Sequence, residues 1–525
     1  MRPLERREYR LVPGTHYGTP KELWGFRTAA RATSRAREFL RANAVLLGLE
    51  PDLAGIARQR VVESLGATHV IFRQAHLGKR IHRAYVTVHV DGRGRVYLAK
   101  NRAMPKGLLP ATRHAPVRAR EAARRARRAL PRRGRAAKVV GTEEMWFPVE
   151  ERLVPCWRIR IERRGPPEEW IVYVNARTGG ILSRYDNVAF ARGGTGSRGR
   201  RARRTGRALV FDPSPVTALG GHNDLITLSG RAWRERRPPR EVYREVRLAG
   251  LGASGFLDGK RVTTKPTRGR VRGRGGDFRF ASHEAGFEET MVYYHVDRAV
   301  RYLEELGFRG RRAIFRTPIE ADARGTRDDN SWYSPHSRRL TFGTGSIDDA
   351  EDAETILHEL GHALQDAIVP DFGQSTEAAA MGEGFGDYFA ASFFYDRKPP
   401  RYRDVVMTWD GLPIGLDEGA NPPALRRLDS KRTYRDFRER GHEHDNGLIW
   451  SATLWEIRRS LGRRITDTIV VESHFQLDGF TTFARGARAI LDADEHLYRG
   501  RHAARLRRIF ARRGIEFRGE RAPRG

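Results

Sequence analysis

The sequence predicts an α+β protein, and three observations support this class. Runs of alternating apolar and polar residues, typical of strands, fill much of residues 40–187 and return around residues 312–343. Apolar residues recur at helical spacing in residues 287–308, and the chain is mostly helical in character from residue 350 onward. At 525 residues the chain has room for about three to four folding units. We therefore expect several domains that combine strands and helices.

The first expected module spans residues 1–110 and contains a hairpin. In "RAYVTVHVDGRGRVYLAK", apolar residues alternate up to an Asp-Gly turn at Asp91–Gly92, and the alternation then resumes. Such spacing on both sides of an Asp-Gly turn is typical of two antiparallel strands. The alternating positions are Val86, Val88 and Val90 before the turn, and Val96 and Leu98 after it.

The second expected module spans residues 111–190. It opens with the alanine-rich stretch "PVRAREAARRARRALPRRG", which predicts a basic helix that stops at Pro131. The stretches "CWRIRIE" and "EWIVYVNARTGGILSRYD" then predict strands, with a turn at Thr178-Gly179-Gly180. The arginines of the helix are interpreted as a solvated face rather than as a binding surface.

Residues 191–208, "ARGGTGSRGRRARRTGRA", have the composition of a linker. They are rich in glycine and arginine and show no apolar periodicity, so they offer few side chains to a core. A loop of this kind is easily cut by a protease. We expect a basic linker here, followed by a longer and more regular domain over residues 209–525.

The composition argues against several classes of protein. The formal net charge is +34, but arginine is spread through every region, whereas specific nucleic-acid binding needs a directed basic patch. No apolar run approaches the roughly 18 residues of a membrane-spanning helix. No apolar stretch follows the charged residues 1–18, so no secretory signal is visible. The single cysteine, Cys156, excludes an internal disulfide framework and any site built on several thiolates.

The stretch "AETILHELGHALQDAI", residues 353–368, predicts a helix that carries a metal site. His358 and His362 lie one turn apart on a common face, so both imidazoles can reach one ion. Glu359 is displaced by about 100° around the axis, which lets it miss the metal and hold a water. Pro370 ends the helix. The apolar positions that argue for a helix packed on one side are Ile356, Leu357, Leu360, Leu364 and Ile368.

A second predicted helix, around "AAAMGEGFGDYFAASFF", offers the third ligand that such a site requires. Glu383 can complete the metal shell, and Asp387, four residues later, can accept a hydrogen bond from a ligand histidine. Each of Gly382, Gly384 and Gly386 costs a helix up to about 1 kcal/mol relative to alanine. These glycines are explained if the two helices must approach each other closely.

The motifs "HELGH" and "GEGFGD" together resemble those of the fungalysin metallopeptidases, and more broadly those of the thermolysin-like group with a glutamate as third zinc ligand. The resemblance extends over most of the chain. It implies a two-lobed thermolysin-like catalytic domain, with a β-rich N-terminal lobe and a mainly helical C-terminal lobe, preceded by an α+β propeptide. Residues 1–110 then resemble the fungalysin/thermolysin propeptide module, and residues 111–190 resemble its second, PepSY-like half.

The resemblance implies one zinc ion per chain, held by His358, His362 and Glu383, with Glu359 as general base. Asp387 would orient a zinc-bound histidine, most simply His358. In "HEHDNG", His444 falls where such peptidases place a donor to the developing oxyanion, and the neighbouring His442 is the alternative.

The resemblance also implies contacts with the substrate. "DDNSWYSPHSRRLTFGTG" resembles the edge strand that pairs with substrate backbone, with Asn330 and Ser331 as the contacts. Arg426, in "PALRRLDS", resembles the arginine that grips the substrate carbonyl beyond the scissile bond, and Arg427 is the alternative. Such enzymes prefer bulky apolar residues just after the cut.

The function expected from the resemblance is a secreted, monomeric zinc endopeptidase, made as a proenzyme whose propeptide acts in cis and whose substrates are proteins and peptides. The alternatives are a catalytically silent binding protein that keeps the fold and a basic nucleic-acid-binding protein. Two features depart from thermolysin itself. No tyrosine lies between His362 and Glu383, and Phe394 stands where a calcium-binding carboxylate is expected, so no calcium is predicted.

Overall fold

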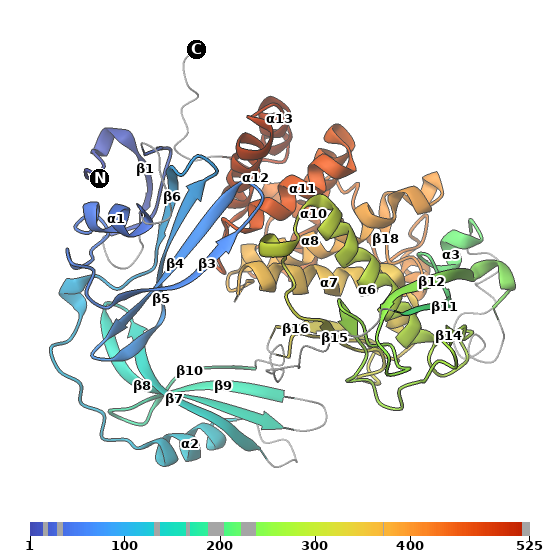
Figure 1. Cartoon of the computed structure of the whole chain (residues 1–525), viewed down its shortest axis with the longest axis horizontal. Helices are drawn as coiled ribbons and strands as arrows, with labels where there is room; N and C mark the ends of the chain where they lie inside the picture. The colour runs from blue at the N-terminus through green and yellow to red at the C-terminus, as the bar shows by residue number, and fades with distance from the viewer. Residues whose placement is uncertain are drawn as a thin grey trace. The chain divides into compact units, whose positions relative to one another are not determined.

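The computed structural model describes residues 1–13, 19–28, 35–130, 137–163, 168–186, 204–221, 238–335, 337–370 and 372–516. Contacts divide the chain into two compact units, one built from residues 1–188 and the other from residues 189–520. Helices and strands occur in both units (Figure 1), which confirms the α+β class. Among the described residues, no helix combines the length and the apolar character needed to cross a membrane.

A ten-stranded sheet is the frame of the first unit. Its strand order is β1-β2-β6-β5-β7-β8-β9-β10, with β4 joining β3 to β5. The two halves of the sheet meet where Ile81 of β5 pairs in parallel with Trp146 of β7. The strands are β1 (Arg10–Pro13), β2 (Pro20–Trp24), β3 (Ile56–Glu63), β4 (Ala67–His76), β5 (Lys79–Asp91), β6 (Val96–Asn101), β7 (Lys138–Val149), β8 (Arg152–Arg163), β9 (Glu168–Asn175) and β10 (Ile181–Asp186).

Both local predictions for this unit are confirmed. Strands β5 and β6 form the expected antiparallel hairpin, and its valines pack in a core with helix α1 (Arg35–Ala42). The basic helix is α2 (Ala119–Arg128), which ends before Pro131. Its small residues Ala122 and Ala126 are buried against β8 and β9, and its arginines lie on the exposed face.

The described part of the second unit contains three small sheets, whose strand orders are β12-β11-β14, β13-β15-β17-β16 and β18-β19. Strand β16 lies at the end of the four-stranded order, as an edge strand should. The strands are β11 (Arg204–Val210), β12 (Arg244–Leu251), β13 (Val262–Thr263), β14 (Asp277–Phe278), β15 (Ile319–Asp322), β16 (Trp332–Ser334), β17 (Arg339–Thr341), β18 (Val405–Val406) and β19 (Arg426–Arg427).

The prediction of a linker over residues 191–208 is wrong for the C-terminal end of this range. Strand β11 begins at Arg204, and it pairs with β12 and, through Arg207 and Ala208, with β14. Residues 204–208 therefore belong to a sheet. Residues 191–203 of the same stretch lie outside the described residues.

Helices dominate the second unit after strand β17. The expected helix over residues 287–308 is α6, which ends where Gly307 adopts a left-handed conformation. The helices are α3 (Pro215–Ala218), α6 (Phe287–Leu306), α7 (Ala353–Ile368), α8 (Thr376–Phe394), α9 (Leu412–Asp417), α10 (Glu443–Leu461), α11 (Arg463–His474), α12 (Phe483–Tyr498) and α13 (Ala503–Arg512).

Helix α8 lies at the centre of this helical region and packs against both α7 and α10 (Figure 1). A buried histidine of helix α6 contacts both the segment after strand β11 and helix α8. The Nε2 of His295 lies 2.8 Å from the carbonyl oxygen of Phe211, just after β11, and its ring contacts the buried ring of Phe394 in α8. The position where thermolysin carries a calcium ligand is thus part of the apolar core.

Candidate metal centre

Helix α7 holds two of the predicted metal ligands. It is capped by Asp352, whose side chain accepts a hydrogen bond of 2.8 Å from the backbone N–H of Glu354, an arrangement that stabilises a helix N-terminus. Its apolar face is buried, and it ends at Ile368, two residues before Pro370. His358 and His362 therefore sit on a well-anchored helix, with Nε2 atoms 3.1 Å apart.

Helix α8 brings the third predicted ligand to the same point. Glu383 lies 3.2 Å from Nε2 of His358 through Oε2 and 3.5 Å from Nε2 of His362 through Oε1. Tetrahedral bonds of about 2.0–2.2 Å would separate neighbouring ligand atoms by about 3.3–3.6 Å. The three donors are thus spaced to fit one small divalent ion with tetrahedral geometry, with a fourth position left over.

A carboxylate and an arginine hold His358 in place through the Nδ1 side of its ring. The Nδ1 of His358 lies 2.9 Å from Oδ1 of Asp387, so this carboxylate can fix the ring orientation and leave Nε2 for the metal. Arg426 donates two hydrogen bonds of 2.7 Å to the same carboxylate. Burial disfavours the charge of Asp387, but Arg426 and His358 outweigh it and lower its pKa to about 2.

The three glycines of α8 have different neighbours. A Cβ on Gly386 would lie 2.7 Å from Nδ1 of His358, and one on Gly361 of α7 would lie 3.0 Å from the Cα of Gly386. The close approach of α7 and α8 therefore depends on this pair. Gly384 faces α10 instead, since its Cβ would lie 2.5 Å from the carbonyl oxygen of Gly447. Around Gly382 a Cβ would make only ordinary contacts, the nearest at 3.6 Å.

We expect Gly386→Ala to impair metal binding and Gly382→Ala to leave it intact. The methyl group at residue 386 would collide with the buried ring of His358 and separate it from Asp387 and Glu383, at a cost typical of overpacking, about 1–3 kcal/mol. Metal content of the purified variants and their thermal unfolding would check this. Equal metal content in the two variants would show that the helix contact does not set the site.

A cavity of about 220 Å³ opens beside the ligands and gathers most of the other predicted residues. His358, Glu359, His444, Asn330, Ser331 and Arg426 all line it. Glu359 is 6% exposed, and its Oε2 is buried without a hydrogen-bond partner among the described residues. Asn330 and Ser331 directly precede the edge strand β16. The structure thus brings all nine predicted site residues to one metal-ligand cluster and its adjoining cavity.

The structure distinguishes the members of two ambiguous pairs. The Nε2 of His444 lies 3.0 Å from Oε2 of Glu383, whereas His442 caps the start of α10 and does not line the cavity. Arg426 faces the cavity and Asp387, whereas Arg427 pairs with Asp429 at 2.9 Å near the surface. The residues favoured from the sequence, His444 and Arg426, are the ones beside the candidate centre.

Sequence reasoning missed three acidic residues in the same cavity, Asp329, Asp349 and Asp410. They come from three segments, before β16, before α7 and after β18, so no short motif unites them. The available signal was the acidic run "DDAED" at residues 348–352, which precedes helix α7.

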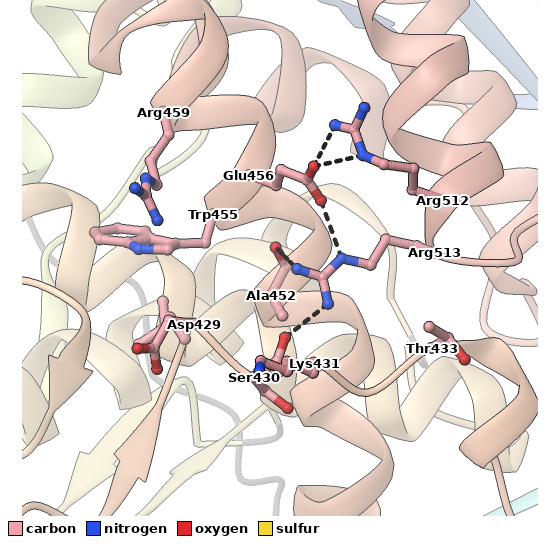
Figure 2. Close-up of a pocket in the computed structure, with 11 residues that line it drawn as sticks. Asp429, Ser430, Lys431, Thr433, Ala452, Trp455, Glu456, Arg459, Arg512 and Arg513 are labelled. Carbon is pink, nitrogen blue, oxygen red and sulfur yellow. Dashed lines mark hydrogen bonds and ion pairs between the residues drawn. The ribbon is translucent and has the colours of Figure 1, made fainter.

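A larger cavity of about 460 Å³ lies elsewhere in this unit, between α10, α13 and residues 428–433 (Figure 2). Two of its basic side chains, Arg512 and Arg513, are bound by groups of the protein itself. Arg512 and Arg513 both bind Glu456, and Arg513 also donates a hydrogen bond of 2.7 Å to the carbonyl oxygen of Ser430. None of the predicted site residues lines it, so we interpret this cluster as structural support for α13.

Comparisons with known proteins agree with the geometry. The family model described as fungalysin metallopeptidase (M36) matches residues 279–519. Extracellular metalloproteinase 2 of Trichophyton tonsurans is 24% identical over 229 residues, which cover 37% of this chain and 36% of that protein. Extracellular metalloproteinase 2 of Arthroderma gypseum is 25% identical over 278 residues, 44% of each chain. The chain thus spans less than half the length of these curated relatives. The resemblance to the fungalysin metallopeptidases is confirmed, and it is carried by the C-terminal residues 279–519, which include the candidate metal centre.

Proposed function

We propose that this protein is a zinc-dependent endopeptidase that hydrolyses internal peptide bonds of proteins. The observation that carries the proposal is the spacing of His358, His362 and Glu383, which fits tetrahedral coordination beside a cavity lined by Glu359 and His444. Nitrogen and carboxylate donors in this number, with one position left for water or substrate, are typical of catalytic zinc sites.

Zinc bound to these ligands would supply Lewis acidity, which polarises a carbonyl and makes water acidic near neutral pH. The proton then has to be taken by the protein. Glu359 is suited to this role because one of its carboxylate oxygens has no partner among the described residues and the side chain lines the cavity. It would accept a proton from the attacking water and deliver it to the departing amine.

The other residues would stabilise the developing negative charge, orient the ligand histidine and bind the substrate. His444, 3.0 Å from Glu383, would donate a hydrogen bond to the oxygen of the scissile carbonyl as negative charge develops on it. Asp387 would keep His358 in the tautomer that presents Nε2, and Arg426 would keep Asp387 ionised and in place. Asn330 and Ser331, beside an edge strand, would pair with the backbone of an extended substrate.

The wider organisation is also part of the proposal. Residues 204–525 would form the two-lobed catalytic domain, since strands prevail in its first part and helices in its second. Residues 1–190 would act as an inhibitory and fold-assisting propeptide in cis, released by cleavage in the basic linker. Secretion of the enzyme is proposed because the relatives are named extracellular metalloproteinases.

Metal removal tests the proposal. We expect the purified chain, once it has been cut in the basic linker, to hydrolyse casein, to lose this activity when its metal is stripped by a chelator, and to regain it on addition of zinc alone. Sequencing of new N-termini after incubation would locate any maturation cut. Protein that binds zinc tightly yet cleaves neither casein nor peptides would be a silent binding protein, and activity in metal-free protein would refute the zinc site.

A further inference from the structure

Three carboxylates line the cavity beside Glu359 and are not used by the proposed chemistry. They belong to Asp329, Asp349 and Asp410, and one oxygen from each lies within 4.8 Å of the others. Asp349 stands just before helix α7, and Thr355 of that helix donates a hydrogen bond of 3.2 Å to Asp410. The group is therefore held against the same helix that carries the metal ligands.

Asp349 has an oxygen that lacks a partner. The residue is 2% exposed, and its Oδ2 accepts hydrogen bonds from the Ser331 hydroxyl and, at 3.3 Å, from the backbone N–H of Gly343. Its Oδ1 is buried and has no hydrogen-bond partner among the described residues. A buried carboxylate oxygen without a donor is costly, so its retention in this cavity points to a ligand that supplies the donor.

The three neighbouring carboxylates repel one another, and a bound cation would reduce this repulsion. Burial, reinforced by repulsion from Asp349 and other nearby carboxylates, raises the pKa of Asp410 well above its ordinary value. Burial and repulsion from Asp329 and Glu359 likewise raise the pKa of Asp349 to about 6. The chain has 98 lysines and arginines, yet within the described part of the chain none forms an ion pair with these three residues. Arg426 lines the same cavity and attracts Asp410 through space, but its guanidinium is bound to Asp387. A positive group from outside would relieve this repulsion.

The remaining walls of the cavity suit the stem of a long basic side chain. Met407, Pro413, Ile414 and Leu425 contribute apolar surface next to the carboxylates. Lysine and arginine combine an aliphatic stem with a cationic head, so they can bury the stem on such a wall while the head reaches the acids. Arginine also offers several N–H donors, which can satisfy more than one carboxylate oxygen at once.

We propose that Asp329, Asp349 and Asp410 form a subsite that binds a lysine or arginine side chain next to the scissile bond of the substrate. The inference rests on the proposed endopeptidase function and deepens it, since it names the substrate class. It departs from the preference for bulky apolar residues that the family resemblance implies.

The test compares arginine with citrulline, its neutral isostere, at each position flanking the cut. A peptide library digested by the full chain, with products identified by mass spectrometry, would first locate the cuts. We expect the arginine peptide to exceed the citrulline peptide in kcat/KM by on the order of 10- to 100-fold. We expect Asp349→Asn and Asp329→Asn to reduce this ratio severalfold or more. Asp328→Asn, an equal charge change at an exposed neighbour outside the cavity, should leave the ratio unchanged.

A binding measurement separates this inference from the proposed function. Anisotropy of labelled peptides with Glu359→Gln protein should show the arginine peptide binding more tightly than the citrulline peptide, with the same dependence on Asp329. Because Asp329 is exposed, its variant should fold even if Asp349→Asn does not. Cleavage with equal kcat/KM for the arginine and citrulline peptides would refute the subsite but not the endopeptidase function. Calcium uptake that depends on Asp349, together with equal kcat/KM for the two peptides, would make the group a metal site. Absence of any cleavage, even after residues 1–190 have been removed by a cut in the basic linker, would refute the endopeptidase, and the binding ratio would still decide the subsite.

Discussion

Replacement of Glu359 by glutamine is expected to reduce peptide hydrolysis by about 10²- to 10⁴-fold, the usual contribution of a general base, while the metal stays bound. Glutamine has nearly the same shape as glutamate but cannot accept the proton. Glu359 lies outside the three-donor group formed by His358, His362 and Glu383, so the variant keeps all three ligands. Casein hydrolysis combined with metal analysis of the same protein sample would check both halves of this expectation.

The matched control is Glu383→Gln, the same chemical change at the neighbouring glutamate of the cluster. Burial disfavours the charge of Glu383, but His362, His358 and His444 hold its pKa far below the ordinary value, so the wild-type group is ionised. Loss of that charge should release the metal as well as the activity. A Glu359→Gln variant that loses metal, or that keeps more than a tenth of wild-type activity, would contradict the roles assigned to these two residues.

The cluster of His358, His362 and Glu383 could be predicted from the sequence because helical geometry is local. Residues four apart lie on one face of a helix, so the positions of His358 and His362 follow from their spacing once residues 353–368 are assigned to a helix. Glu383 required one further assumption, that a glycine-containing helix packs against the first. Gly386, whose Cβ would strike His358, is the physical basis of that assumption.

Features that depend on distant segments could not be predicted in the same way. The pair between Asp387 and Arg426 forms only because strand β19 returns to helix α8 after 39 residues. The acidic group draws on three segments separated by loops. Strand β11 was missed because its pairing uses backbone groups, which a Gly/Arg-rich composition does not reveal. Gly206 in that strand has a packing reason, since its Cβ would lie 2.6 Å from the carbonyl oxygen of Gly276.

Arg426 has two possible tasks, and its neighbour allows them to be separated. The family resemblance assigns it to the substrate carbonyl, whereas the structure shows it bound through two nitrogens to Asp387, which is 2% exposed. Breaking a buried ion pair by removing one partner typically costs about 3–5 kcal/mol, because the remaining charge is left uncompensated. Weakening the support of a ligand histidine typically costs about 10- to 100-fold in metal affinity.

We therefore expect Arg426→Ala to lower both the unfolding temperature and the zinc affinity. Arg427→Ala should change neither by much, because its pair with Asp429 is largely exposed and surface pairs contribute about 0–1 kcal/mol. Thermal unfolding with and without zinc, together with kcat and KM for one peptide, would separate the two tasks. If Arg426 served the substrate alone, its removal would raise KM and leave stability and metal affinity unchanged. Partial recovery of stability in the double variant Arg426→Ala/Asp387→Asn would show instead that the arginine acts through Asp387, since the uncompensated charge is then gone.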